Sequence, residues 1–343
     1  MRILAAAKAG FDYNRTQILL KGLEAIGNEV HLHTIPDRNS KCGRELSFLS
    51  QEADLVYVPP FRHRDLNFVR KYSKAPVVFD PLISRYLTKV VDYGHYWKAP
   101  QKWWVDYKDF RNCDLLLADT QAHLDYFVKT LKLPKKLPKA VVPVGVNTDD
   151  YQASGVRKNQ KFTLGFYGTF VPLQGVQTII EAVALLKNEE DLEFKILGTG
   201  HQYEDMRKLA SVRGLEQSIF KGWVPYQELA TELNQFDLAF GIFGKSLKAD
   251  LVVPNKLYHY AAMGIPCISK ESPGVSEVFT NGENLITTNT SPKDLAQRIM
   301  ELKFEPEKLK AIGANARRLM EKSYSHKGVA KIFMRAVEES GIL

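Results

Sequence analysis

The sequence is poor in cysteine and has no long apolar run, and both shortages exclude classes of protein. Its three cysteines, Cys42, Cys113 and Cys267, are odd in number and widely spaced. This spacing supports neither a disulfide framework nor a zinc site, and it fits a reducing compartment best. No stretch is long enough to span a bilayer, and the apolar run that follows Met1 is too short for a signal peptide. We therefore expect a cytoplasmic protein without a metal site.

Low-complexity tracts are also missing, and the composition is that of a globular protein. Apolar residues make up 45% of the chain and charged residues 25%, which are ordinary values for folded domains. A length of 343 residues is more than one hydrophobic core requires, so two domains are expected.

The charge is basic and unevenly placed. The net charge is +8, and residues 1–150 carry 23 Lys and Arg against 17 Asp and Glu. A basic first half favours a peripheral contact with the anionic inner face of a membrane, or an anionic acceptor. An ordinary solvated surface is the equal alternative. No nucleic-acid motif accompanies the charge, so we expect no nucleic-acid partner.

Short apolar runs alternate with amphipathic stretches along the chain. Strands are expected at residues 3–7, 30–34, 55–58, 77–79, 115–118, 141–144, 163–167, 194–197, 238–242, 267–269 and 285–287. Apolar strands that alternate with helices are typical of α/β proteins with parallel sheets buried on both faces. We predict two doubly wound, Rossmann-like domains facing a cleft, over residues 1–153 and 154–324. A last helix over residues 325–343 is expected to cross back to the first domain.

Glycine turns follow two strands of the second half. In such sheets, ligands bind beyond the carboxyl ends of the strands. A glycine turn that opens a helix offers free N–H groups and the helix dipole to a phosphate, although most such glycines only permit a tight turn. The first turn supplies Gly168, Thr169, Gln174 and Gly175; the second, with Gly198 and Gly200, would admit a base or ribose.

Residues 254–266 are the most informative segment. Pro254 suits the start of a helix, with Asn255 and Lys256 in its first turn. A cation there opposes the helix dipole, which makes sense if an anion binds as well; a lysine reaching into water is the alternative. His259 lies on nearly the same face and could bond a ribose hydroxyl, although a lone histidine is more often a satisfied polar residue.

Another candidate base contact lies in residues 222–225. Trp223, with Val224 beside it, could stack on a base, and a buried core tryptophan is an equal alternative. Residues 93–108 mix aromatic residues with lysines. Trp97, Trp103 and Trp104 could enter a membrane interface or line a lipid-linked acceptor site; core packing is the commoner explanation.

These segments, in this order, resemble the GT4 family of retaining glycosyltransferases. The matching motifs cover most of the chain and lie at residues 115–121, 143–149, 166–169, 174–175, 197–200, 254–266 and 282–284. The resemblance implies a GT-B fold and a hexosyltransferase-like enzyme. It also implies transfer of a sugar from a nucleotide-diphosphate donor to a glycan, lipid-linked or small-molecule acceptor, with retention and without a metal or other cofactor.

The resemblance also assigns residues in the first half. Gly10, Asn14 and Arg15 resemble the first acceptor loop of the family, and Arg15 would contact an anion. Many members have a histidine near the position of Asp80, which we expect to orient or deprotonate an acceptor hydroxyl; a turn cap before Pro81 is the equal alternative. Arg85 could meet a phosphate or an acidic sugar. With Asp80, Lys256 is the other expected catalytic residue.

The donor site departs from the family pattern. Members usually carry an arginine and a lysine in the glycine loop, where this chain has Thr169 or Phe170 and Gln174. Two glutamates on the donor helix are replaced by Leu251, with Asp250 beside it, and by His259. Each lost cation would contribute about 1.5–3 kcal/mol, and Lys256 would supply part of that. A degenerate binding or scaffold protein and a nucleotide-sugar epimerase therefore remain alternatives.

Overall fold

The computed structural model describes residues 1–152 and 160–343. It forms two compact units, Met1–Gly145 with Ser323–Leu343, and Val146–Lys322. The expected boundary between residues 153 and 154 lies outside the described residues, and the division at Gly145 precedes it. The C-terminal division falls after Lys322, two residues before the expected one.

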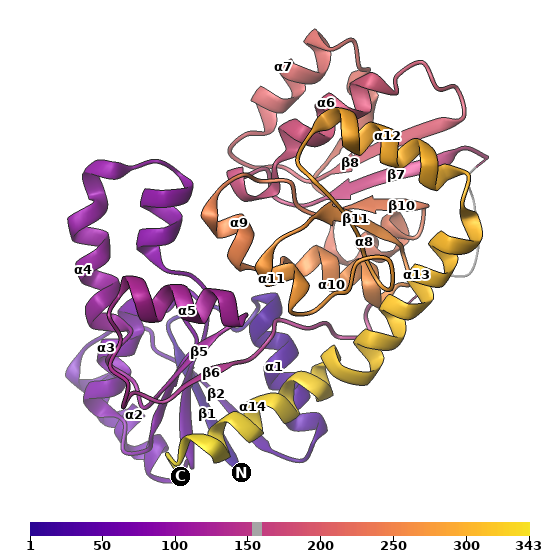
Figure 1. Cartoon of the computed structure of the whole chain (residues 1–343). Helices are drawn as coiled ribbons and strands as arrows, with labels where there is room; N and C mark the ends of the chain where they lie inside the picture. The colour runs from indigo at the N-terminus through magenta and orange to yellow at the C-terminus, as the bar shows by residue number, and fades with distance from the viewer. Residues whose placement is uncertain (153–159) are drawn as a thin grey trace. The chain divides into compact units, whose positions relative to one another are not determined.

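The first unit is built on a parallel sheet of six strands (Figure 1). Its strand order is β2-β1-β3-β4-β5-β6, and every pairing is parallel. The strands are β1 (Arg2–Ala7), β2 (Glu29–Thr34), β3 (Leu55–Val58), β4 (Val77–Phe79), β5 (Leu115–Ala118) and β6 (Lys139–Val141). The strand was expected at residues 141–144, but β6 ends at the first of these, Val141, because Pro143 has no N–H with which to extend the ladder.

Helices cover both faces of this sheet, which is why β3 and β5 are buried at every position. They are α1 (Asn14–Ala25), α2 (Ser40–Gln51), α3 (His63–Tyr72), η1 (Leu87–Asp92), η2 (Tyr96–Lys98), α4 (Ala99–Asp109), α5 (Gln121–Thr130) and α14 (His326–Ser340). Helix α14 packs on α1. Gly22 permits this approach, since a Cβ atom there would stand 2.0 Å from the carbonyl oxygen of His326.

The second unit repeats the scheme with the order β12-β11-β10-β7-β8-β9. Its strands are β7 (Phe162–Tyr167), β8 (Leu192–Leu197), β9 (Phe220–Gly222), β10 (Leu238–Phe240), β11 (Cys267–Lys270) and β12 (Ile286–Thr288). The pairings are again parallel. Two Rossmann-like parallel-sheet domains were predicted, and both are confirmed.

The helices of the second unit pack mainly on a core of apolar residues from β7, α6 and α12. They are η3 (Pro172–Gln174), α6 (Val176–Leu185), α7 (Tyr203–Val212), η4 (Gln217–Ile219), α8 (Tyr226–Leu233), α9 (Leu247–Leu251), α10 (Asn255–Ala262), α11 (Pro273–Ser276), α12 (Pro292–Lys303) and α13 (Pro306–Leu319). The short helix η5 (Met320–Tyr324) spans the division after Lys322. In residues 1–152 and 160–343, no helix has the length and apolar character that crossing a bilayer requires.

Candidate functional site

Two glycine turns touch at the carboxyl ends of β7 and β8. The N–H of Gly168 donates to the carbonyl of Leu197 at 3.0 Å. A Cβ atom on Gly198 would stand 2.1 Å from the carbonyl oxygen of Gly168, and one on Gly200 would stand 2.6 Å from the nitrogen of Phe170. Neither position has room for a larger residue. The structure thus brings together Gly168, Gly198 and Gly200, as expected for a site built on adjacent strands.

Lys256 points from α10 toward the first of these turns. It is the second residue of a helix that begins after Pro254, and its Nζ would lie 2.9 Å from a Cβ atom on Gly168. The side chain is 3% exposed, and its amine has no hydrogen-bond partner among the described residues. The alternative of a lysine reaching into water is therefore wrong, because the side chain extends into the unit.

Burial decides the charge state of the Lys256 amine. The Nζ lies 3.5 Å from the centroid of the Phe166 ring, and such a contact favours the charged form by about 0.5–2 kcal/mol. Removing an ammonium from water costs several kcal/mol, which is more. Burial accordingly lowers the pKa of Lys256 well below its ordinary value. Without a ligand, the amine is held at a place that disfavours its charge.

His259 lies one turn further along α10 and stacks between two tyrosines. Its ring centroid is 4.0 Å from that of Tyr151, with the planes 16° apart, and 5.9 Å from that of Tyr167, with the planes 6° apart. The Tyr167 hydroxyl is hydrogen-bonded to Nδ1 of His259. Burial lowers the pKa of His259 to about 3, so the ring is neutral at physiological pH. The expected ribose contact stays a prediction.

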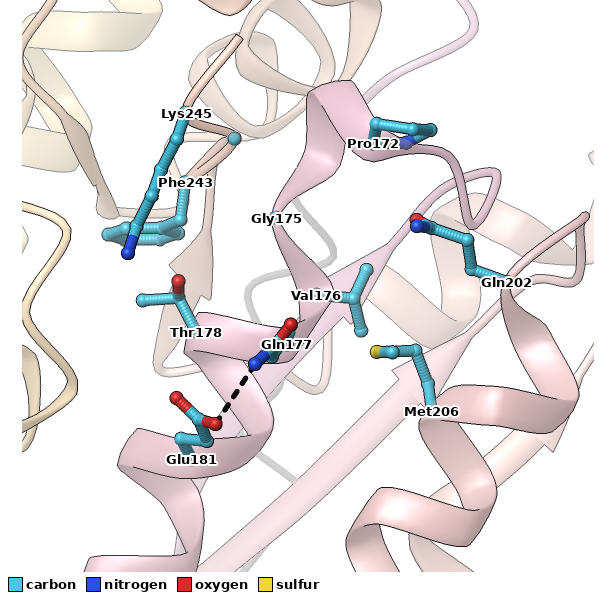
Figure 2. A pocket seen from close by; sticks show the side chains of 11 residues that line it. Pro172, Gly175, Val176, Gln177, Thr178, Glu181, Gln202, Met206, Phe243 and Lys245 are labelled. Atoms are coloured by element: carbon cyan, nitrogen blue, oxygen red, sulfur yellow. Dashed lines mark hydrogen bonds between the residues drawn. The ribbon is translucent and has the colours of Figure 1, made fainter. Parts of the chain in front are cut away.

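Gly175 ends the first turn and precedes α6. Its φ of 62° is left-handed, and a Cβ atom would stand 2.2 Å from the backbone of Phe243. Figure 2 shows a hollow beside this helix start, lined by Gly175, Gln202 and Lys245 among others. Lys256 and His259 do not line it. The hollow is therefore separate from the place where the buried amine lies.

The other expected donor residues are spread over neighbouring loops. Trp223 is 70% exposed, so the alternative of a core tryptophan is wrong and its ring is open to stacking. Val224, Pro254 and Asn255 are half-buried, and Thr169 is exposed. Gln174, at the place of the family's lysine, is buried, and its Oε1 has no hydrogen-bond partner in the described ranges.

In the first unit, Asp80 and Arg15 form a buried ion pair. The Arg15 Nε donates to Oδ2 of Asp80 at 2.6 Å, and the Tyr57 hydroxyl donates to the same oxygen at 3.0 Å. The exposed fractions of the Arg15 and Asp80 side chains are 2% and 0%. Although burial opposes the charge on Arg15, the Asp80 carboxylate raises the pKa of Arg15 above its ordinary value. The turn-cap alternative for Asp80 is wrong, because its side chain bonds across the fold.

Part of this ion pair is left without partners. Oδ1 of Asp80 and both terminal nitrogens of Arg15 are buried and make no hydrogen bond to any described residue. The two residues were expected to have separate roles, one in catalysis and one in binding the acceptor. Because they form one ion pair, a change in either residue affects the other, and both roles stay predictions.

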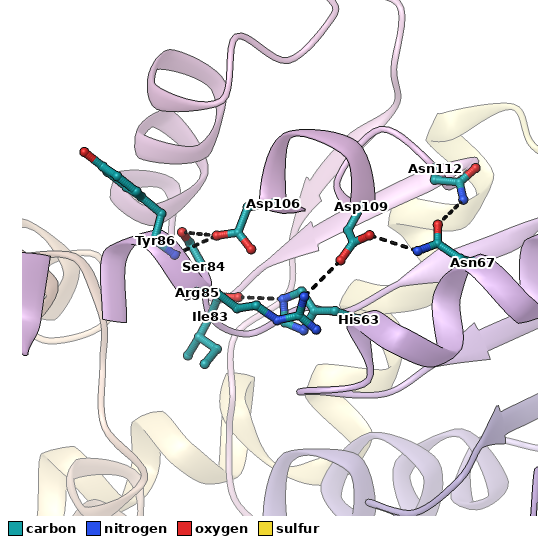
Figure 3. A network of polar contacts seen from close by, with 9 residues as sticks. All are labelled: His63, Asn67, Ile83, Ser84, Arg85, Tyr86, Asp106, Asp109 and Asn112. Carbon is teal, nitrogen blue, oxygen red and sulfur yellow. Dashed lines mark hydrogen bonds and ion pairs between the residues drawn. The ribbon is translucent and has the colours of Figure 1, made fainter. Parts of the chain in front are cut away.

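Arg85 belongs to a polar network beneath α4 (Figure 3). Its guanidinium pairs with Asp109 at 3.3 Å. Nearby, Oδ2 of Asp106 accepts from the Ser84 hydroxyl at 2.7 Å and from the Tyr86 N–H at 2.8 Å. Burial raises the pKa of Asp106 to about 6. Arg85 therefore already has an anionic partner, and its contact with an acceptor stays a prediction.

Gly10 and Asn14 flank the start of α1. Gly10 has a φ of 100°, and a Cβ atom there would stand 3.2 Å from Nε of Arg62. Asn14 is the first residue of α1. In the described part of the chain, no group of three or more His, Cys, Asp or Glu side chains could hold a metal ion.

Comparison with known proteins identifies the second unit. A family model described as glycosyl transferases group 1 matches residues 147–319, about half of the chain. The chain belongs to this family.

Curated relatives of this group 1 chain match it over a similar length. An uncharacterized glycosyltransferase of Methanocaldococcus jannaschii is 25% identical over 49% of the chain and 46% of its own length. A GDP-mannose-dependent monoacylated alpha-(1-6)-phosphatidylinositol monomannoside mannosyltransferase of Corynebacterium glutamicum is 26% identical over 50% of the chain and 47% of its own length. The chain thus spans about half the length of the curated relatives it matches.

Solved structures of the same fold match the whole group 1 chain. Anabaena Alr3699/HepE in complex with UDP-glucose has a TM-score of 0.74 and 17% identity, covering 100% of both chains. Sucrose-phosphate synthase from Thermosynechococcus elongatus has a TM-score of 0.73 and 13% identity, covering 99% of this chain and 98% of its own. At these identities the likeness establishes the GT-B fold.

Sequence reasoning missed the tyrosines that contact His259 and Asp80 in this group 1 protein. Tyr151 and Tyr167 were not singled out, although Tyr167 directly precedes the glycine turn. Tyr57 was missed as a partner of Asp80, since a tyrosine inside an apolar strand looks like a core residue. All the expected donor residues lie within the matched range of 147–319, whereas Asp80 and Arg15 lie outside it.

Proposed function

We propose that this protein transfers a sugar from a nucleotide-diphosphate donor to an acceptor, with retention, and that its second unit binds the donor. The observation that carries the proposal is the buried amine of Lys256, which faces the Gly168 turn without a hydrogen-bond partner among the described residues. An unsatisfied buried polar group costs about 1–3 kcal/mol. Such a cost is typical of a site that is completed by its ligand. A diphosphate would supply the missing partner and favour the charged amine.

The remaining donor residues surround the Lys256 amine in this proposal. The N–H groups of Gly168 and Gly175 already donate to the carbonyls of Leu197 and Pro172, so in this turn the N–H of Thr169 is the one that meets the diphosphate. The turn at Gly198 and Gly200 lets the sugar or ribose approach the backbone. Trp223 and Val224 contact the base, and His259 contacts the ribose. Lys256 stabilises the charge that develops on the leaving diphosphate, and this electrostatic support is the main catalytic contribution of the unit.

The first unit binds the acceptor in this proposal. Asp80 orients the acceptor hydroxyl through Oδ1, and Arg15 holds Asp80 in place through Oδ2. Because Asp80 is closed to solvent, the side chains that cover it move when the acceptor binds. Gly10, Asn14 and Arg85 line the path of the acceptor. A cytoplasmic protein at the inner face of a membrane, acting on a lipid-linked acceptor, fits the basic first half.

A thermal-shift titration against UDP, GDP, ADP, CMP and their sugar conjugates tests the donor assignment. A ligand at about 100 times its Kd stabilises the fold by about 2.7 kcal/mol. We expect one nucleotide class to stabilise the wild type and to have no effect on Lys256→Met. If all of them leave the wild type unchanged, the donor assignment is wrong.

A donor-binding protein without turnover is the second candidate. It is favoured by Thr169 and Gln174, which stand where the family usually has cations. The two candidates differ in one measurement, the release of free nucleotide from the stabilising donor when candidate acceptors are added. Release shows transfer, whereas stabilisation without release supports the second candidate.

A further inference from the structure

A helical segment over residues 87–109 projects from the first unit (Figure 1). It comprises η1, η2 and α4, and it carries three of the exposed large aromatic residues of the protein. The exposed fractions are 70% for Tyr96, 74% for Trp97 and 51% for Trp104. Trp97 stacks on His95 with ring centroids 5.0 Å apart, and Trp104 stacks on Tyr107 at 5.5 Å, so each ring is held in place with much of its surface still in water. Three exposed aromatic side chains on one short segment indicate a contact surface.

The neighbouring Trp103 shows that this exposure is specific to particular positions. Trp103 packs against the sheet core, and its indole N–H donates to the carbonyl of Thr130 at 2.8 Å. The next residue, Trp104, is turned about 100° further around the helix axis and is exposed. Of the three tryptophans grouped from the sequence, two are therefore available at the surface and one is structural.

Lysines accompany the aromatic residues on this segment. The Nζ of Lys98 lies 5.7 Å from the Trp97 ring, that of Lys108 lies 5.3 Å from the Trp104 ring, and that of Lys89 lies 4.9 Å from a third ring, Tyr93. These contacts place a positive charge beside each ring. Aromatic side chains with adjacent lysines are the pattern that favours the interfacial layer of a membrane.

The acidic residues of the segment point away from this surface. Asp106 and Asp109 are 0% and 5% exposed, and Figure 3 shows both carboxylates bonded inside the polar network beneath α4. The third, Asp92, is half-buried. The outward face of the segment therefore carries net positive charge, and it is complementary to phosphate headgroups.

We propose that the 87–109 segment docks on an anionic lipid bilayer. Tyr96, Trp97 and Trp104 enter the interfacial layer, and Lys89, Lys98 and Lys108 contact headgroup phosphates. This proposal rests on the membrane contact proposed above and gives it a location. It does not require sugar transfer, because docking can be measured without donor or acceptor.

Sedimentation of the full chain with lipid vesicles tests the proposal. We expect the wild type to sediment with vesicles that contain phosphatidylglycerol, much less with phosphatidylcholine alone, and less as salt is added. The double variant Trp97→Ala/Trp104→Ala is expected to bind at least about tenfold more weakly. Replacing Lys89, Lys98 or Lys108 with glutamine is expected to weaken binding about fivefold per lysine.

Phe304 offers a matched control in the second unit. It is 72% exposed, and the Nζ of Lys303 lies 5.2 Å from its ring, so it repeats the aromatic–lysine pair outside the segment. Phe304→Ala is expected to bind vesicles like the wild type. If Phe304→Ala weakens vesicle binding as much as Trp97→Ala/Trp104→Ala does, binding depends on exposed aromatic residues anywhere on the surface, and the proposal is overturned.

Two further outcomes would also overturn it. One is a wild type that stays in the supernatant with both kinds of vesicle. The other is self-association in the absence of lipid that depends on Trp97 and Trp104, which would assign the surface to a second copy of the chain. The nucleotide thermal shift, measured on the same samples, separates these failures from a failure of the donor proposal.

Discussion

Replacing Lys256 with methionine removes a buried amine and keeps a side chain of similar length. In the wild type this amine has no hydrogen-bond partner among the described residues, and leaving a buried polar group unsatisfied costs about 1–3 kcal/mol. Methionine has no such group and fills the space beside the Phe166 ring. We therefore expect Lys256→Met to raise the free energy of unfolding of the second unit by about 1–3 kcal/mol at neutral pH.

The same variant has a predictable pH dependence. Burial lowers the pKa of Lys256 in the folded state, so the unfolded state binds more protons between that pKa and the ordinary lysine value of about 10.4. The stability of the wild type then rises with pH across this window. The penalty is fully present below the folded pKa and is relieved toward about pH 10.4. The advantage of Lys256→Met is therefore expected to shrink as the pH is raised.

Thermal unfolding followed by circular dichroism measures both effects. For a unit of this size, each kcal/mol shifts the Tm by about 2–4 °C. Lys270→Met is the matched control, because Lys270 is also buried but its amine donates to the Gly244 carbonyl and to Asp250. That variant loses satisfied bonds and is expected to be less stable than the wild type. A Lys256→Met protein that is no more stable than the wild type, or that still responds to nucleotide, would refute the reasoning.

The remaining predictions concern nucleotide binding, the ion pair and metal dependence. If a bound diphosphate restores the charge of Lys256, donor affinity measured by calorimetry should weaken by up to about tenfold per pH unit above the pKa that Lys256 has in the ligand-free protein. A pH-independent affinity would contradict this. Gly168→Ala should weaken donor binding, because the new Cβ would lie 2.9 Å from the Lys256 amine. Gly282→Ala is the control, since Gly282 also has a positive φ but a Cβ there would meet no atom within 4 Å, and donor binding should be unchanged. Asp80→Asn should leave the buried charge of Arg15 without its anionic partner and lower the free energy of unfolding by about 3–5 kcal/mol, with donor binding retained; denaturant titration and thermal shift separate the two effects. Turnover should persist in EDTA, and its loss would show that a metal is needed.

The fold could be predicted from the sequence because it depends on local pattern. Strands buried on both faces, such as β3 and β5, read as continuous apolar runs, and glycine turns mark the ends of β7 and β8. Side-chain partners across the fold could not be predicted in this way. Arg15 and Asp80 are 65 positions apart, and nothing in either local sequence records that they meet.

Adjacent residues show the same limit at short range. Trp103 and Trp104 are identical in type and neighbours in sequence, yet one packs in the core and the other is exposed. Their fates depend on the rotation of α4 about its axis, which the sheet sets and the mixed pattern of residues 93–108 does not reveal. His259 was similarly found on the helix, but the two tyrosines that enclose its ring come from distant segments.

Lys256 and Gly168 explain together how this chain can bind a diphosphate after losing the family's loop cations. A cation in the loop would approach the phosphates from the loop itself, whereas Lys256 approaches from α10 and ends beside Gly168. The amine reaches that place only because residue 168 has no Cβ atom. The low dielectric that makes the free amine costly also strengthens its attraction to a phosphate. One buried lysine can therefore replace part of what two solvated cations contribute. The same burial lowers the stability of the ligand-free protein, and the stability gained by Lys256→Met measures that loss.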